Sequence, residues 1–250
     1  MQNEILTVKD LNRYLPAIKT NEDMAFTNKL HEGLFLADPI DGLANIPDES
    51  IDLIITEPTM QPKSNSLSGK SPTFENYVDW VDGWLEESKR VLTPNGSIYI
   101  ICPWQSSSMY HSVLEKKFNV QSRITAERKS EQEGLSQWKN TISDIWFATK
   151  TNDYIFNQNY IVDGKNINSP NPEEIKNNLW FHLDYDEIIH RILKGSSFKL
   201  NWVLDPFMGI GSVGSVAKKI GRRFIGFESN QDKLLLAMKT INEGCLLYTS

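Results

Sequence analysis

Cysteine is nearly absent from this sequence, which has only two in 250 residues. Cys102 and Cys245 stand far apart, and neither has a partner at the spacing of a metal site. This excludes a disulfide-framework protein and a zinc-finger type of site, and we predict no metal centre. Each cysteine is expected to be either a small buried hydrophobic side chain or a surface thiol.

Long apolar runs are also missing. No stretch of the sequence approaches the roughly 18 apolar residues that a membrane-spanning helix needs. The first ten residues lack the basic segment followed by an apolar one that marks a signal peptide. We therefore expect a cytoplasmic protein with no membrane segment.

Positive charge is in deficit, with 26 Lys and Arg against 32 Asp and Glu and a net charge of −6. The overall charge gives no electrostatic indication of a nucleic-acid partner, although local basic patches remain compatible with one. With 40% apolar residues the chain can bury one substantial core. We expect a single domain over residues 31–250, preceded by an accessory segment at residues 1–30.

Segments with helical spacing of apolar residues alternate with β-branched segments, which predicts an α/β protein with a three-layer, doubly wound sheet. The expected strands are 34–38, 51–56, 97–102, 119–126, 144–149, 202–204 and 224–227. The expected helices are 7–15, 40–46, 77–92, 109–118, 186–193 and 213–220. A tryptophan stripe in the helix at 77–92 is expected to pack into the core. The remaining segments of note are polar stretches expected to be loops or connections, at 61–73, 127–137 and 157–178, and a tail at 243–250 that fits neither helix nor strand.

The most informative segment is 203–212, Val-Leu-Asp-Pro-Phe-Met-Gly-Ile-Gly-Ser. A buried strand ends at Asp205, and Gly209 and Gly211 then permit a tight turn and the close approach of a ligand. Ser212 occupies the position of an N-cap for the helix that follows. Glu228 ends the next strand, about 20 residues after the glycines, where a carboxylate that accepts hydrogen bonds from a ribose is expected. The alternative is an ordinary strand-helix-strand unit with Glu228 on a solvated turn.

A second segment lies earlier in the chain, where the strand 51–56 runs directly into Glu57-Pro58-Thr59-Met60. Together the two segments resemble the circularly permuted (β-type) DNA amino-methyltransferases. In that family a catalytic tetrapeptide, Asp/Asn/Ser-Pro-Pro-aromatic, follows a strand near the N-terminus, and the cofactor motif Asp-Pro-Phe-x-Gly-x-Gly comes later. This chain has the same order, and the resemblance runs from about Leu34 to Ile241. It implies S-adenosylmethionine as cofactor, DNA as substrate, and methylation of adenine N6 or cytosine N4.

The resemblance assigns seven residues to the cofactor site: Asp38, Asp205, Phe207, Gly209, Gly211, Ser212 and Glu228. Phe207 and the glycines are expected on the methionine and ribose side, and Glu228 at the ribose hydroxyls. Asp38 is expected near the adenine, or alternatively as a mere turn residue before a proline. These assignments agree with the chemistry, because a diol favours a carboxylate acceptor and a zwitterionic tail favours backbone donors beside an acid.

The resemblance assigns catalysis to Glu57, Pro58, Thr59 and Met60. In the family the first side chain and the carbonyl of the first proline accept the two hydrogens of the exocyclic amine, and the aromatic fourth residue stacks on the flipped base. Here Glu57 keeps an acceptor but is one methylene longer, Thr59 replaces the second proline, and Met60 has no π face. Three of the four positions therefore depart from the family pattern.

Two functions stay open. One is an active DNA amino-methyltransferase that uses Glu57 and the Pro58 carbonyl. The other is a catalytically impaired partner subunit that assists an active methyltransferase in a homo- or heterodimer. The altered tetrapeptide favours the second, as do the acidic residues at 130–133, where relatives have a basic loop. In either case residues 127–180 would be a reduced target-recognition region. A small-molecule or protein methyltransferase fits the acidic charge but not the order of the strands.

Overall fold

The computed structural model describes residues 6–24, 30–58, 74–132, 140–157 and 177–246. Within them a 9-stranded sheet has the order β1-β2-β9-β8-β3-β4-β6-β5-β7. The strands are β1 (Lys19–Thr20), β2 (Gly33–Leu36), β3 (Ile51–Thr56), β4 (Leu92–Pro103), β5 (Asn119–Gln132), β6 (Asn140–Thr149), β7 (Leu179–Trp180), β8 (Trp202–Asp205) and β9 (Arg223–Glu228). The helices are α1 (Val8–Tyr14), α2 (Pro39–Ala44), α3 (Phe74–Val91), α4 (Trp104–Leu114), α7 (Tyr185–Ser196), α8 (Ser212–Lys219) and α9 (Gln231–Leu246). In this part of the chain no helix is both long and apolar enough to cross a membrane.

The sheet is doubly wound, as predicted. β6 is antiparallel to its two neighbours, and every other pairing in the described sheet is parallel. From β8 the chain crosses through α8 to β9 on one side, and from β3 it crosses through α3 to β4 on the other side. Because β3 and β8 are neighbours, their carboxyl ends form the topological switch point of the sheet, which is where such folds bind ligands.

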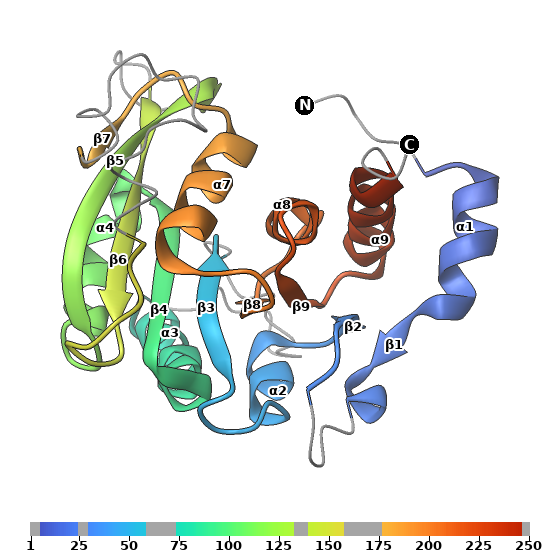
Figure 1. Ribbon diagram of the computed structural model, residues 1–250, viewed down its shortest axis with the longest axis horizontal. Helices are drawn as coiled ribbons and strands as arrows, with labels where there is room; N and C mark the ends of the chain where they lie inside the picture. The colour runs from blue at the N-terminus through green and yellow to red at the C-terminus, as the bar shows by residue number, and fades with distance from the viewer. Residues whose placement is uncertain (1–5, 25–29, 59–73, 133–139, 158–176, 247–250) are drawn as a thin grey trace.

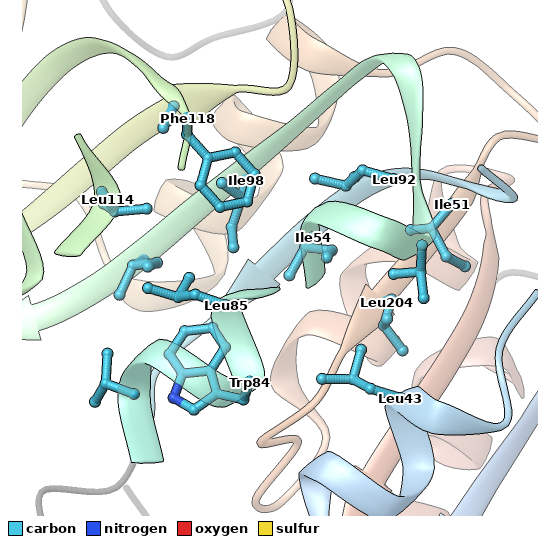
Figure 2. Packing of buried hydrophobic residues seen from close by; sticks show 14 of the residues in the cluster. Leu43, Ile51, Ile54, Trp84, Leu85, Leu92, Ile98, Leu114, Phe118 and Leu204 are labelled. Atoms are coloured by element: carbon cyan, nitrogen blue, oxygen red, sulfur yellow. The ribbon is translucent and has the colours of Figure 1, made fainter. Parts of the chain in front are cut away.

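Helices cover both faces of the sheet, so the molecule has three layers. Figure 1 shows α7, α8 and α9 on one side of the sheet and α2 and α3 on the other. An apolar cluster fills each interface. Figure 2 shows the cluster beneath α3, where Trp84 and Leu85 pack with Ile54 and Ile98. Trp84 is fully buried and Trp80 packs at the margin of the same cluster, so the tryptophan stripe belongs to the core, as predicted.

Three strands are clearly longer than the sequence pattern predicted: β4, β5 and β6, the last of which begins at Asn140 rather than at residue 144. β4 begins at Leu92, which already pairs with Ile51, and the register then shifts before pairing resumes at Ser97. β5 continues to Gln132 through residues that we predicted to be a charged loop. Antiparallel pairing with β6 runs to Glu127 and resumes at Gln132 after a register shift, and because such pairing uses only the backbone, a charged composition does not prevent it.

The two ends of the described chain lie side by side. Thr7 and Asp10 form a capping box at the start of α1, which confirms a helix in the segment predicted at 7–15. Asp10 also pairs with Lys239 of α9 at 3.2 Å, and β1 adds an outer strand beside β2. The helix predicted at 7–15 ends at Tyr14, because a 3-10 turn begins at Leu15, whose side chain is exposed. α9 continues through residues 243–246, which the sequence pattern had left unassigned.

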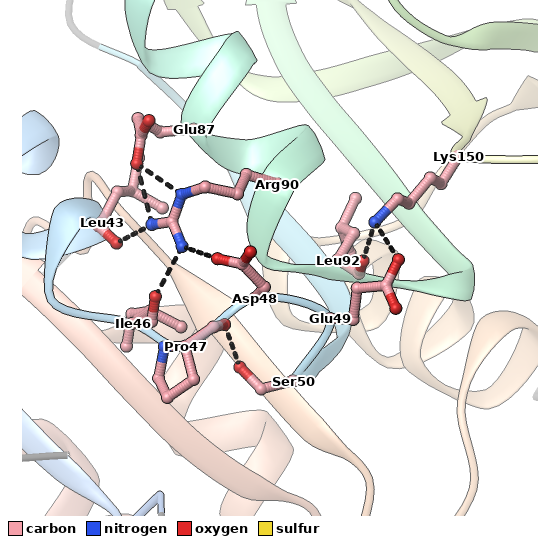
Figure 3. A network of polar contacts seen from close by, with 10 residues as sticks. All are labelled: Leu43, Ile46, Pro47, Asp48, Glu49, Ser50, Glu87, Arg90, Leu92 and Lys150. Carbon is pink, nitrogen blue, oxygen red and sulfur yellow. Dashed lines mark hydrogen bonds and ion pairs between the residues drawn. The ribbon is translucent and has the colours of Figure 1, made fainter. Parts of the chain in front are cut away.

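Arg90 joins α3 to α2 at the amino edge of the sheet (Figure 3). Its guanidinium donates hydrogen bonds to the carbonyl oxygens of Leu43 (2.8 Å) and Ile46 (2.9 Å), at the end of α2. It also pairs with Asp48 and with Glu87, one turn earlier on α3. Arg90 therefore adds a side-chain donor to the Leu43 carbonyl, which also accepts the N–H of Ile46 (2.9 Å), and supplies one to the Ile46 carbonyl just beyond α2.

We expect Arg90→Met to lower the free energy of unfolding by about 2–3 kcal/mol, because hydrogen bonds from a charged donor to partly buried acceptors are lost. Urea denaturation followed by circular dichroism measures this change. Arg13→Met is the matched control, since Arg13 is exposed and donates a 3.3 Å hydrogen bond to Asn242. The control should cost less than about 0.5 kcal/mol. Equal losses in the two variants would contradict the role given to Arg90.

Candidate functional site

The carboxyl ends of β2, β9, β8 and β3 meet at one edge of the sheet. Leu36 of β2 pairs with Glu228 of β9, and Asp205 of β8 pairs with Gly226 of β9. An acidic residue ends or follows each of these four strands: Asp38, Glu228, Asp205 and Glu57. The residues predicted for the cofactor and the first residue of the predicted catalytic segment therefore come to the same edge.

Asp205 is buried at this edge and links the two central strands. Its Oδ1 accepts hydrogen bonds from the hydroxyl of Thr56 (2.8 Å) and from the backbone N–H of Phe207 (3.1 Å). Burial raises the pKa of Asp205 to about 7 despite these hydrogen bonds, and the negative charges of Glu228 and Glu57 act in the same direction as burial. The negative charges of two carboxylates thus act on Asp205 at this edge, an arrangement that favours a cationic ligand.

The turn after β8 depends on two glycines. Gly209 and Gly211 have left-handed φ angles of 56° and 87°. The N–H of Met208 donates to the carbonyl of Phe227 (2.9 Å), which ties the turn to β9. Gly211 is the N-cap of α8 and Ser212 is its first helical residue, so the prediction of Ser212 as N-cap is wrong. The cap needs a φ of +87°, which glycine adopts without strain and serine does not.

A side chain would meet different surroundings at the two glycines. A Cβ on Gly211 would lie 3.0 Å from both Cα and Cβ of Ala237, so the packing of α8 on α9 requires glycine. For a Cβ on Gly209, the nearest described atom outside the adjacent residues would be the carbonyl oxygen of Phe207, at 4.0 Å. Gly209 therefore borders open space at the carboxyl edge, whereas Gly211 is constrained by packing.

Phe207 connects the turn to α3. Its ring is half-buried and packs edge to face on Trp80 and Trp84, with ring centroids 5.3 and 5.2 Å apart. The helix that follows β3 therefore supports the turn that follows β8.

Asp38 and Glu228 are both oriented by local backbone donors. Oδ1 of Asp38 accepts a hydrogen bond from the N–H of Ile40 (2.9 Å) and caps α2, which is the turn role considered above as the alternative. Oε1 of Glu228 accepts from the N–H of Asn230 (2.8 Å). The side chain of Asp38 is exposed and that of Glu228 is half-buried. The cap at Asp38 leaves its carboxylate at the surface of the edge, so capping does not exclude contact with a ligand.

The predicted catalytic segment lies only partly within the described residues. Glu57 follows β3 directly and is half-buried, and Pro58 is buried. Thr59 and Met60 lie outside the described residues. Glu57 directly follows Thr56, whose hydroxyl bonds Asp205, so it leaves β3 beside the end of β8.

Two features of this edge were not predicted from the sequence. One is Thr56; the available signal was a hydroxyl at the last position of an otherwise apolar strand. The other is Asp144, fully buried on β6, whose Oδ1 accepts a 2.9 Å hydrogen bond from Nε of Arg123. It pairs in register with Cys102, whose pKa is raised to about 12, by burial first and then by the charges of Asp144 and Glu57. Cys102 is therefore an unreactive buried thiol, and no cluster of metal-binding side chains occurs in the described residues.

The model of the DNA methylase family, the N6/N4 methyltransferases, matches residues 51–239. This chain belongs to that family. The methylase is 27% identical over 241 residues to type II methyltransferase M.HpaI of Haemophilus parainfluenzae, covering 85% of this chain and 75% of that protein. Its fold is similar to that of the PvuII DNA methyltransferase (cytosine-N4-specific), with a TM-score of 0.69, 16% identity and 93% of each chain covered. It is also similar to the structure of an M1.HpyAVI–SAM complex, with a TM-score of 0.61, 21% identity, and 84% of this chain and 98% of that one covered.

The raised pKa of Asp205 predicts a pH-dependent stability for this methylase. Between the ordinary value of 3.8 and about 7, the folded state keeps a proton on Asp205 that the unfolded state has lost. This residue therefore makes the folded state less stable as the pH rises through that window. Asp205→Asn cannot titrate, so its unfolding free energy minus that of the wild type should increase from about pH 4 to pH 7, by a few kcal/mol as an order of magnitude. Urea denaturation at each pH measures the difference, and a difference independent of pH would contradict the raised pKa.

Proposed function

We propose that this chain is an S-adenosylmethionine-dependent DNA methyltransferase of the permuted class, acting on the exocyclic amine of adenine (N6) or cytosine (N4). The observation that carries the proposal is the buried hydrogen bond from Thr56 to Asp205. It joins the strand that leads into the glycine turn to the strand that leads into Glu57. A cofactor on the turn and an amine at Glu57 would then occupy adjoining places. The Glu57 segment precedes the turn in the chain, which is the order of the permuted class.

The residues around the turn suit S-adenosylmethionine, which has a sulfonium and an ammonium cation, a carboxylate and a ribose diol. Gly209 leaves room for the close approach of the ligand. The first turn of α8, beginning at Ser212, has backbone N–H groups without helical acceptors, and these would receive an anionic group. Glu228 would accept hydrogen bonds from the diol, and Asp38 would lie near the adenine. Asp205, beneath them, would hold the turn in position through the N–H of Phe207.

When bound, the cofactor supplies an electrophilic methyl group. The amine of the base is a weak nucleophile, because its lone pair is delocalised into the ring. The Glu57 carboxylate and the Pro58 carbonyl would accept its two hydrogens and direct the lone pair at the methyl group. As the new N–C bond forms and the S–C bond breaks, Glu57 would take the departing proton or pass it to water.

The other parts of the chain have proposed places around this site. Residues 31–250 would form the catalytic domain, with residues 1–30 as an accessory segment and residues 127–180 as a reduced target-recognition region. Arg123 is exposed on β5 and oriented by the buried Asp144, so it is a candidate for contact with DNA phosphate.

The second candidate function is a catalytically impaired subunit that assists an active methyltransferase as a dimer partner. It is favoured by the departures at Glu57, Thr59 and Met60 from the family tetrapeptide. The extra methylene of Glu57 displaces its carboxylate, and misplacement of a catalytic group by about 1 Å costs on the order of 10²-fold in rate.

The two glycines test the cofactor site. Gly211→Ala is expected to cost about 3 kcal/mol of stability, since both the φ angle and the contact with Ala237 oppose a side chain. Gly209→Ala should cost only about 1 kcal/mol, for its φ angle. The folded Gly209→Ala protein should nevertheless bind S-adenosylmethionine at least about 10-fold more weakly than the wild type, because its Cβ occupies the ligand's approach. Calorimetric titration measures the affinity. Wild-type affinity in Gly209→Ala would contradict this placement of the cofactor.

Glu57 tests the reaction. With labelled S-adenosylmethionine and unmethylated plasmid DNA, Glu57→Gln is expected to reduce the rate of methyl transfer by about 10²-fold or more. Its affinity for S-adenosylmethionine should stay within about 2-fold of the wild type, because Glu57 contacts the amine and not the cofactor. Glu22→Gln, on an exposed 3-10 turn, is the matched control and should leave the rate unchanged.

The same assay separates the two candidate functions. A folded wild-type protein that binds S-adenosylmethionine but transfers no methyl group to DNA would overturn the first proposal. The triple variant Glu57→Asp, Thr59→Pro, Met60→Tyr would then show whether the family tetrapeptide creates activity. A variant that stays inactive, together with a stable heterodimer, would favour the partner subunit.

A further inference from the structure

Exposed large apolar side chains gather at the carboxyl edge of the described sheet. Those at this edge are Phe74, Trp104, Leu179, Phe181 and Ile210, and those elsewhere are Val8, Leu15, Phe198 and Leu200. Phe74, Trp104 and Phe181 are exposed by 71%, 55% and 52%. Single exposed apolar residues need no explanation, so the ring that matters is the one beside the candidate site.

The topology accounts for this gathering. Trp104 directly follows β4, and Phe181 directly follows β7, which runs parallel to β4. Phe74 begins α3, whose other end leads into the amino end of β4. All three rings therefore stand on the same edge as the glycine turn. Phe198, exposed by 51%, precedes β8 and lies at the opposite edge.

Among the exposed aromatic residues, Trp104 is the one that follows the strand adjoining β3 and Glu57. Ile100 of β4 pairs with Thr56 of β3, and neighbouring strands lie about 4.8 Å apart. Glu57 is the first residue after Thr56, and Trp104 is the fourth after Ile100. Trp104 therefore follows the end of β4, the strand that adjoins β3, and lies farther beyond the edge of the sheet than Glu57.

The support beneath Trp104 is rigid. The Ser106 hydroxyl donates to the carbonyl of Pro103 (3.2 Å), which fixes the turn into α4. The indole N–H of Trp146 donates to the carbonyl of Ser107 (3.1 Å), which ties the first turn of α4 to β6. The exposure of Trp104 is therefore a property of a well-packed helix start, and a ring on such a support is pre-organised for stacking.

The predicted catalytic tetrapeptide lacks the aromatic residue that its family has at the fourth position. Met60, the fourth residue of the catalytic tetrapeptide, has no π face with which to stack on a flipped base. We propose that Trp104 provides the aromatic face for the target nucleobase beside Glu57, in place of the missing aromatic at position 60. This inference rests on the proposed function. It assigns Trp104 as a positioning residue that orients the base and takes no part in proton transfer.

The test compares Trp104→Ala, Trp104→Phe and the control Phe198→Ala. Stacking on one base contributes about 1–3 kcal/mol, which corresponds to about 5- to 150-fold. We expect Trp104→Ala to lower kcat/KM for unmethylated plasmid DNA within that range, with affinity for S-adenosylmethionine unchanged. Trp104→Phe should recover most of the loss because it keeps a π face, and Phe198→Ala should match the wild type. Wild-type kcat/KM in Trp104→Ala, or a Trp104→Phe variant as impaired as Trp104→Ala, would overturn the inference.

A second measurement needs no methyl transfer. If the wild-type chain is inactive, that result overturns the proposed function. Stacking by Trp104 is then tested by the affinity of the protein for an oligonucleotide. Fluorescence anisotropy with a labelled single-stranded oligonucleotide containing adenine and cytosine then decides. Trp104→Ala should weaken the affinity by at least about 5-fold relative to Phe198→Ala. Equal affinities of the two variants would overturn the inference.

Discussion

The hydrogen bond from Thr56 to Asp205 is the contact on which the arrangement of the site depends. It is buried between β3 and β8, where the two windings of the sheet diverge. Because the same Asp205 oxygen accepts the N–H of Phe207, one atom fixes both the end of β3 and the first bend of the glycine turn. Phe207 in turn packs on the tryptophans of α3. The segment proposed for catalysis and the segment proposed for the cofactor are thus held in one rigid unit.

The site and its DNA substrate both carry negative charge. Asp205, Glu228 and Glu57 place carboxyl groups at one edge, which suits the cations of S-adenosylmethionine, whereas DNA is a polyanion and the chain carries a net charge of −6. Recognition of DNA therefore rests on local contacts rather than on the overall field. Arg123 offers one positive charge, and the aromatic rings around the edge offer contacts that need no charge.

The sequence predicted which strand ends and acidic residues form the site, but not the hydrogen bonds and backbone angles that hold them together. The strand at 51–56 has the predicted bounds, and Asp38, Glu57, Asp205 and Glu228 could be brought to one edge because parallel strands end together. The bond between Thr56 and Asp205 joins residues 149 positions apart, and no local pattern indicates it. The N-cap was wrong because a left-handed φ at Gly211 is a backbone property. Trp104 was missed because the predicted helix began at 109, whereas α4 begins at 104.

The order of the strands has a consequence for how the chain folds during synthesis. β2 and β3 emerge early, yet they do not pair with each other, because β9 and β8 lie between them. The N–H of Phe224 on β9 donates to the Glu32 carboxylate next to β2, across 192 residues. The central strands β8 and β9 are therefore synthesised last. Until then, the edges of β2 and β3 that face them have no hydrogen-bonding partners. Such long-range pairing is intrinsically slow and exposes strand edges to aggregation.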